Sequence, residues 1–189
     1  MGEDGPGDQP SIEDSITYDE TFPSVTERYY TPRYYVDDKA GEDMCVLFHS
    51  NRICLLTLAP SHPIIKQKKT ITKFDFQVTE HTNRLNNAVL GKRKKGAQQL
   101  QCDSIVCRIH CQDQEEDRVY TIRSYINGKL IEINEMLIKQ PNLAVSAPQA
   151  AGYIAIILPK LDNSEKQKMK LLDKESYHNL LNQRQGIND

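Results

Sequence analysis

Residues 119–158 carry the sequence VYTIRSYINGKLIEINEMLIKQPNLAVSAPQAAGYIAIIL, the stretch that decides the fold. Two strand-like runs flank its Asn127-Gly128 pair, with Tyr120, Ile122 and Ser124 before the pair and Leu130, Ile131 and Ile133 after it. An Asn-Gly pair in this setting predicts a β-hairpin with a type I′ turn, because both residues tolerate positive φ. Beyond a polar link around Pro141, the apolar run 153–158 predicts a buried strand. The stretch therefore indicates a β-protein.

Length and composition fit one globular domain with tails, at 189 residues, 38% apolar, 26% charged and a net charge of −2. Nothing in this balance demands nucleic acid or membrane as a partner, and no apolar run approaches the ~20 residues of a membrane span. The acidic start lacks the basic and apolar regions of a signal peptide. Five cysteines are an odd number for a disulfide framework. We therefore expect a soluble intracellular protein with reduced thiols and no membrane contact.

Composition divides the chain into four parts. Residues 1–24 have excess acid and few large apolar side chains, which predicts a disordered tail. Residues 25–43 gather four of the nine tyrosines around Pro32, which predicts an extended segment packed against the domain, with a binding face as the alternative. Residues 44–160 hold the short apolar runs of a β-module, and residues 161–189 change to a helical period.

The β-module consists of short apolar runs separated by turn residues. The predicted strands are 46–48, 53–58, 73–79, 104–110 and the runs already described. In the third of them Phe74, Phe76 and Val78 alternate with polar side chains, the pattern of one half-buried strand. Many short strands at this spacing predict a β-sandwich or barrel.

The C-terminal part predicts one or two helices laid on this module. Asn163 or Ser164 suits the N-cap, and Gln167 three residues after Ser164 completes a capping box. The expected apolar helix positions are Met169, Leu172, Leu180 and Leu181. Asp173 or Ser176 suits a second start after a kink.

Two segments resemble lipoyl-type proteins. Residues 91–109, GKRKKGAQQLQCDSIVCRI, resemble the basic turn and inward strand of biotinyl and lipoyl domains. Residues 124–162 resemble the glycine-cleavage H protein in a hairpin glycine, a strand ending in Asn-Glu, a Pro-x-Leu link and a Gly-aromatic strand. The matching residues are Gly128, Asn134, Glu135, Pro141, Leu143, Gly152 and Tyr153. The resemblance covers residues 74–181 and implies a mainly β, lipoyl/biotinyl-like hybrid barrel-sandwich with a C-terminal helix.

The whole chain, including YYTPRYYVD at 29–37 and KRKKGAQQL at 92–100, resembles the Abitram family of actin-binding transcription modulators. This resemblance implies a non-enzymatic protein without a cofactor or metal. It implies that monomeric or filamentous actin is the partner, and that the protein modulates transcription as well as actin dynamics in filopodia and dendrites. It also implies a location in nuclear speckles and in the cytoplasm, including actin-rich cell projections.

The sequence departs from a carrier protein at the place where an H protein presents its lipoyl-lysine on a hairpin tip. The corresponding residues 111–118, CQDQEEDR, contain no lysine. Glu116 or Asp117 lies nearest the expected position, and a carboxylate does not form the amide that attaches lipoate or biotin. Arg118 stays protonated and non-nucleophilic. The alternative is an atypical carrier that uses another lysine, such as Lys129.

A second alternative is a thiol or zinc enzyme built on Cys107, His110 and Cys111, which together with Cys102 form a cluster of possible zinc ligands. Their spacing is not the C-x2-C pairing of common structural zinc sites. Cys107 also follows the apolar alternation of its strand, where a buried free cysteine is an ordinary core residue. Since Cys107 and His110 lie three apart, a regular strand directs them to opposite faces. We expect no metal or catalytic site here.

The candidate partner-binding residues are Lys92, Arg93, Lys94 and Lys95, hereafter the basic turn. Such a run suits docking on an acidic protein such as actin, recognition by the nuclear import machinery, or contact with nucleic acid. Direct nucleic-acid binding is the weakest of these readings, because interleaved aromatic residues are missing. A solvated turn without a partner is the plain alternative.

Two further expectations concern the surface around the basic turn. The second basic run, Lys66, Lys68, Lys69 and Lys73, extends the same positive face if the intervening loop folds back. Exposed edge strands of a β-module also suit self-pairing, so a homo-oligomer is compatible with the sequence.

Overall fold

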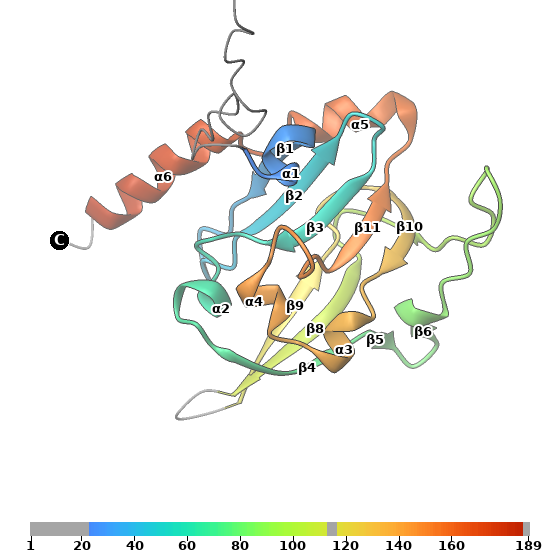
Figure 1. Cartoon of the computed structure of the whole chain (residues 1–189), viewed down its shortest axis with the longest axis horizontal. Coiled ribbons are helices and arrows are strands. Elements are labelled where there is room, and N and C mark those ends of the chain that lie inside the picture. The colour runs from blue at the N-terminus through green and yellow to red at the C-terminus, as the bar shows by residue number, and fades with distance from the viewer. Residues whose placement is uncertain (1–22, 113–116, 187–189) are drawn as a thin grey trace, which may run out of the picture.

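The computed structural model describes residues 23–112 and 117–186. Within them, a six-stranded and a three-stranded sheet lie on either side of one core, and a two-stranded ribbon lies beside them (Figure 1). The predicted disordered tail falls almost wholly outside the described residues. None of the described helices is both long enough and apolar enough to cross a membrane.

The six-stranded sheet joins the two ends of the β-module, and all its neighbours pair antiparallel. Its strands in spatial order are β1 (Tyr30–Tyr35), β2 (Met44–His49), β3 (Cys54–Leu58), β11 (Ala155–Leu158), β10 (Gly128–Ile133) and β7 (Gln99–Leu100). The strands predicted from the runs 46–48 and 53–58 are thus confirmed as β2 and β3. The predicted final strand is confirmed in a shorter form as β11.

The smaller sheet consists of β4 (Thr70–Asp75), β8 (Ile105–Gln112) and β9 (Arg118–Arg123), and the ribbon consists of β5 (Gln77–Thr79) and β6 (Thr82–Asn83). Phe74, Phe76 and Val78 are all buried, as predicted. The prediction of one strand over residues 73–79 is wrong, because the chain leaves the sheet after Asp75. The carboxylate of Asp75 accepts a hydrogen bond from the Gln77 N–H at 3.0 Å, a local bond that bends the backbone.

The predicted hairpin at Asn127-Gly128 is also wrong. β9 and β10 exist where the sequence placed them, but they belong to different sheets, so the residues between them form a crossover. The positive φ in this connection is at Tyr125, not at Asn127 or Gly128. Glycine is required at position 128 because the backbone there passes close to β11: a Cβ would lie 2.7 Å from Ile157 Cγ2.

β2 is buried on both faces over its first five residues, which explains their unbroken apolar sequence MCVLF. Met44, Val46 and Phe48 face the main core between the sheets. Cys45 and Leu47 face a second, smaller core beneath the C-terminal segment. The remaining members of that second cluster are Tyr34, Ala59 and Tyr177.

The C-terminal segment forms α5 (Leu161–Lys168) and α6 (Lys174–Gly186), which lie outside the six-stranded sheet (Figure 1). The predicted capping box at Ser164 is wrong, because α5 begins at Leu161 and Gln167 instead binds the backbone N–H and C=O of Asn127. Met169 is likewise not a packed position, since it is 77% exposed.

The second helix start occurs at one of the two predicted places. The carboxylate of Asp173 accepts a hydrogen bond from the Ser176 N–H at 2.7 Å, just before the first turn of α6. Within α6, Tyr177 stacks on Tyr34 with ring centroids 4.0 Å apart. This aromatic pair fastens the helix to β1.

The Tyr-rich segment is extended only from Tyr30 onward. Residues Val25–Tyr29 form the single helical turn α1, because Ser24 and Glu27 make a capping box there. The outer edge of β1 is partly covered: the Tyr30 N–H bonds to the Thr26 carbonyl, and Pro32 has no N–H. Tyr34 exchanges two backbone hydrogen bonds with Leu172. These contacts leave few backbone N–H groups of this edge open to further strand pairing.

Short helical turns occupy the remaining connections. They are α2 (Pro63–Lys66), η1 (Arg84–Asn86), α3 (Met136–Lys139) and α4 (Leu143–Ser146). The last two lie in the predicted polar link. Gly152 closes this link against α4, where a Cβ would meet the Leu143 carbonyl oxygen at 2.0 Å.

Candidate functional site

The basic turn is a tight, well-defined loop between β6 and β7. Leu90 and Lys95 exchange two backbone hydrogen bonds of 2.9 Å, which close the loop at its base. Gly91, Lys94 and Gly96 have positive φ values of 63°, 51° and 78°. A Cβ on Gly96 would lie 2.3 Å from the Ala88 carbonyl oxygen, so the return of the chain here requires glycine.

Lys129 on β10 fixes the position of this loop. Its ammonium donates hydrogen bonds to the carbonyl oxygens of Arg93 at 2.8 Å and Lys94 at 3.2 Å. Asn87 adds a second attachment, donating to the Leu130 carbonyl at 2.8 Å. The loop is therefore fastened to the edge of the six-stranded sheet, and its side chains project from a fixed base.

A hollow of about 170 Å³ lies between the basic turn and the end of β11. Its cationic lining residues are Lys92, Arg93, Lys94, Lys129 and Lys160. Within residues 23–112 and 117–186, none of these five forms an ion pair. Among the described residues that line the hollow none is acidic, and Gln99, Leu158 and Pro159 complete its wall.

Three of the four residues of the basic turn thus share one hollow, and Lys95 does not line it. Sequence reasoning missed Lys129 and Lys160, because neither stands near the basic run in the chain. The sequence by itself does not indicate Lys129. The residue directly follows Gly128, but only the structure shows that Gly128 begins the strand paired with β7.

The expectation that the second lysine run extends this positive face is wrong. Lys66 ends α2, which lies on the opposite side of the molecule from the loop between β6 and β7 (Figure 1). The chain does not fold back between the two runs, because β4 and β5 carry it across the molecule.

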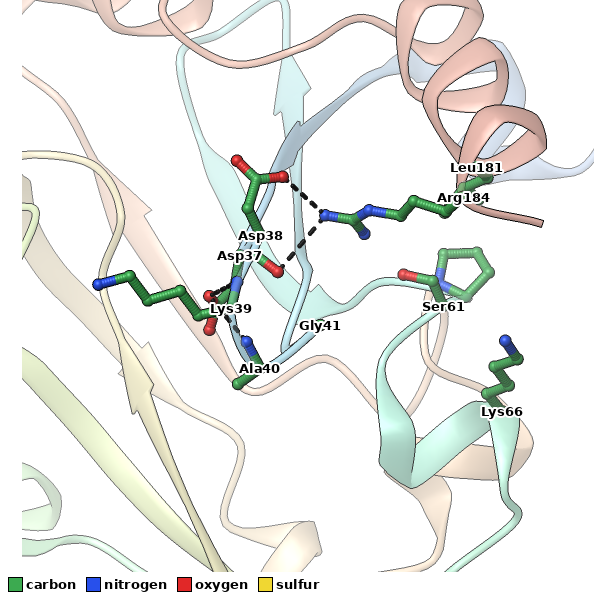
Figure 2. Close-up of a pocket in the computed structure, with 10 residues that line it drawn as sticks. Asp37, Asp38, Lys39, Ala40, Gly41, Ser61, Lys66, Leu181 and Arg184 are labelled. Atoms are coloured by element: carbon green, nitrogen blue, oxygen red, sulfur yellow. Dashed lines mark hydrogen bonds and ion pairs between the residues drawn. The ribbon is translucent and has the colours of Figure 1, made fainter. Parts of the chain in front are cut away.

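A second hollow, about 740 Å³, lies between residues 37–41, the turn at Ser61 and helix α6 (Figure 2). Arg184 reaches into it from α6 and contacts Asp43 Oδ2 at 2.8 Å and Asp38 Oδ1 at 3.0 Å. The Asp43 side chain is fully buried and also accepts hydrogen bonds from Ser61 and Tyr177. These charges are mutually paired, so their evident role is to lock α6 onto the barrel.

The same region brings together Asp43, Ser61 and His62, but not with the connections of a catalytic triad. The Ser61 hydroxyl lies 2.8 Å from Asp43 and 2.5 Å from the Tyr177 hydroxyl, and it has no hydrogen bond to His62. His62 Nδ1 instead accepts from the Ile64 N–H at 3.2 Å. Burial lowers the pKa of His62 to about 4. Ser61 therefore has no histidine partner of the kind that activates the serine of a catalytic triad.

The cysteines also fail to form a reactive site. Cys107 is fully buried, and burial raises its pKa, which disfavours the nucleophilic thiolate. Cys111 is buried as well, whereas Cys102 is exposed on a turn. In the described part of the chain, no group of three His, Cys, Asp or Glu side chains is placed to hold a metal ion. The thiol or zinc alternative gains no support from these residues.

Comparison with known proteins decides the family. The family described as Glycine cleavage H-protein matches residues 78–184, more than half of the 189 residues. Proteins named Abitram are similar over most of their length: that of Gallus gallus is 46% identical over 161 residues, covering 84% of this chain and 91% of the relative. That of Danio rerio is 44% identical over 165 residues, with coverages of 86% and 91%. The relative from Dictyostelium discoideum is 36% identical over 164 residues, with coverages of 84% and 89%.

The chain belongs to the Abitram family. The match to the H-protein family confirms the predicted lipoyl-like barrel-sandwich for this chain. Residues 111–118, where the sequence resemblance predicts the carrier hairpin, join β8 and β9, which pair antiparallel. Of the residues predicted nearest the lysine position, Asp117 is exposed, and Glu116 lies outside the described residues.

The structure also bears on the carrier alternative at Lys129. This lysine lies inside β10, half-buried, and its ammonium is held by two carbonyl oxygens. A carrier lysine must present a free amine at an exposed tip. Lys129 therefore suits a structural role beneath the basic turn better than attachment of a prosthetic group.

Proposed function

We propose that this chain is a non-enzymatic actin-binding protein that modulates actin dynamics and, in the nucleus, transcription. Membership of the Abitram family supports the proposal, as does an H-protein-like barrel without a lysine in its carrier hairpin. The single observation that carries it is the basic turn, a set of exposed and half-buried cations on a fixed loop that form no ion pair within the described residues. We further propose that the protein works in nuclear speckles and in the cytoplasm, including filopodia and dendrites.

The physical argument rests on charge and preorganisation. An exposed lysine that has no ion-pair partner keeps its full attraction for an acidic surface, and a fixed loop loses little conformational freedom on docking. Such contacts speed association and weaken as salt rises, because the Debye length falls from ~10 Å at 0.1 M to ~3 Å at 1 M. Binding through the basic turn should therefore be strongly salt-dependent.

Filament co-sedimentation of a variant with Lys92, Arg93, Lys94 and Lys95 all replaced by Ala tests this contact. We expect the variant to lose at least about tenfold in affinity, because several charge-assisted contacts disappear together. A parallel assay with monomeric actin decides which form is preferred. Unchanged binding to both forms would remove the basic turn from the interface.

The matched control removes the same charge elsewhere. It replaces four exposed lysines by Ala: Lys66, Lys73, Lys139 and Lys170. Net charge is identical in the two variants, so equal losses would show that overall charge, not the basic turn, governs binding. We expect the control to bind within about twofold of the unaltered protein.

We also propose that the basic turn engages the nuclear import machinery. Fluorescent fusions of the same two variants separate the two roles, since import and actin binding have different readouts. The basic-turn variant should shift toward the cytoplasm while the control stays distributed as before. An unshifted basic-turn variant would assign nuclear entry to another part of the chain.

A further inference from the structure

The cation-lined hollow beside the basic turn has the properties of an anion-binding site. Its five cations come from three parts of the chain: the turn itself, Lys129 on β10, and Lys160 after β11. We propose that this hollow binds one phosphate group of a small multiply phosphorylated anion. The site shares residues with the proposed actin contact but does not depend on actin binding.

The hollow is preorganised before any ligand arrives. Lys129 donates hydrogen bonds to the carbonyl oxygens of Arg93 and Lys94, and these bonds fix the orientation of the turn. Lys160 is the N-cap residue of α5, and it is exposed. Within residues 23–112 and 117–186 its ammonium forms no ion pair, so it is available to a ligand in the hollow. The backbone of the turn is therefore fixed before binding, and the conformational freedom lost on binding is mainly that of the lining side chains.

Size and charge select the ligand class. A volume of about 170 Å³ is well below the ~300–1,000 Å³ of sites that enclose whole ligands, so one group enters while the rest stays outside. A phosphate group carries a charge of about −1.5 to −2 and three strong acceptor oxygens. Lysine and arginine donors on several sides of the hollow match that group better than a singly charged carboxylate with two oxygens.

Titration with inorganic pyrophosphate tests the site, using the full chain at 0.15 M salt with NMR shifts and calorimetry as readouts. We expect saturable 1:1 binding. Arg93→Gln and Lys160→Gln should each weaken it about tenfold, because each removes one charge-assisted hydrogen bond. Thermal unfolding of each variant checks that the exposed substitutions leave the fold intact.

Lys95→Gln is the matched control, because Lys95 belongs to the same turn and loses the same charge but does not line the hollow. We expect it to change pyrophosphate affinity less than about twofold. Loss at Lys95→Gln as large as at Lys160→Gln would overturn the proposal, since a diffuse positive surface would then explain binding. Absence of saturable binding would overturn it too.

Vesicles distinguish the source of the phosphate. The chain is tested on phosphatidylcholine vesicles that contain either phosphatidylinositol bisphosphate or phosphatidylserine at equal charge. Selective binding to the former, lost with Lys160→Gln, assigns the site to a lipid headgroup. Pyrophosphate binding without vesicle binding assigns it to a soluble anion, and both results support the proposal. Vesicle binding without pyrophosphate binding contradicts it. Failure of the site leaves the actin proposal standing if the basic-turn variant still loses co-sedimentation.

Discussion

Asp43→Asn is expected to destabilise the protein markedly by releasing α6 from the barrel. Asp43 Oδ1 accepts from the Asp37 N–H at 2.8 Å, and Oδ2 accepts from Ser61, Tyr177 and Arg184. An asparagine amide has one oxygen and one NH2 group. Its NH2 group must therefore face either the Asp37 N–H or the donors of Ser61, Tyr177 and Arg184, which places one donor opposite another. The change keeps the shape of the side chain but removes its charge and one acceptor.

The magnitude follows from burial. Breaking a fully buried ion pair costs about 3–5 kcal/mol, but the Arg184 side chain is 29% exposed and keeps its contact with Asp38. We therefore expect a loss of about 2–3 kcal/mol in the free energy of unfolding. For a chain of 189 residues this corresponds to a fall in Tm of about 4–12 °C.

Urea unfolding followed by circular dichroism measures the loss, and hydrogen exchange in α6 shows whether the helix is released first. Asp38→Asn is the control, because it removes a carboxylate from the same Arg184 at a side chain that is 82% exposed. That control should cost less than about 1 kcal/mol. Equal effects of the two substitutions, or a loss below about 0.5 kcal/mol for Asp43→Asn, would refute the reasoning that burial makes this contact strong.

Other predictions concern pH, close packing and a hydroxyl. Burial lowers the pKa of His62 to about 4, so the unfolded chain binds a proton first and stability falls as pH drops from about 6.5 toward 4. The loss is about 1.4 kcal/mol per pH unit in urea titrations, and His62→Asn should flatten it. Gly152→Ala places a Cβ 2.0 Å from the Leu143 oxygen and should cost more than about 2 kcal/mol, whereas Gly186→Ala, with nothing within 4 Å, should stay within about 0.5 kcal/mol. Comparable thermal shifts for the two would contradict the clash. Tyr177→Phe keeps the ring stacking but loses the hydroxyl contacts, so calorimetry should show a loss of about 1–2 kcal/mol, and an unchanged Tm would show those contacts to be neutral.

Most strands could be predicted because their signal is local. The apolar run of β2 and the alternation of Phe74, Phe76 and Val78 were sufficient to predict buried positions. Strand pairing could not be predicted in the same way. Asn127-Gly128 has the composition of a hairpin turn, yet contacts with Ile157 and Gln167 place it in a crossover. The conformational preference of a turn sequence contributes less free energy than the packing of two sheets against each other.

The candidate site shows the same division. The basic turn is visible in the sequence as four consecutive cations. In the sequence, no motif or neighbouring charge distinguishes Lys129 and Lys160 from the other lysines of the chain. They join the turn only because β10 and β11 are paired in antiparallel register next to β7.

The sequence by itself determined the β-module, its family and the absence of a lysine from residues 111–118, because these depend on local periodicity and on motifs. Only the tertiary structure decided which strands pair, that Asp43 and Arg184 lock α6, and which cations share a hollow. Those outcomes depend on contacts between residues far apart in the chain, and the free energy of such contacts is set by burial and geometry rather than by neighbours in sequence.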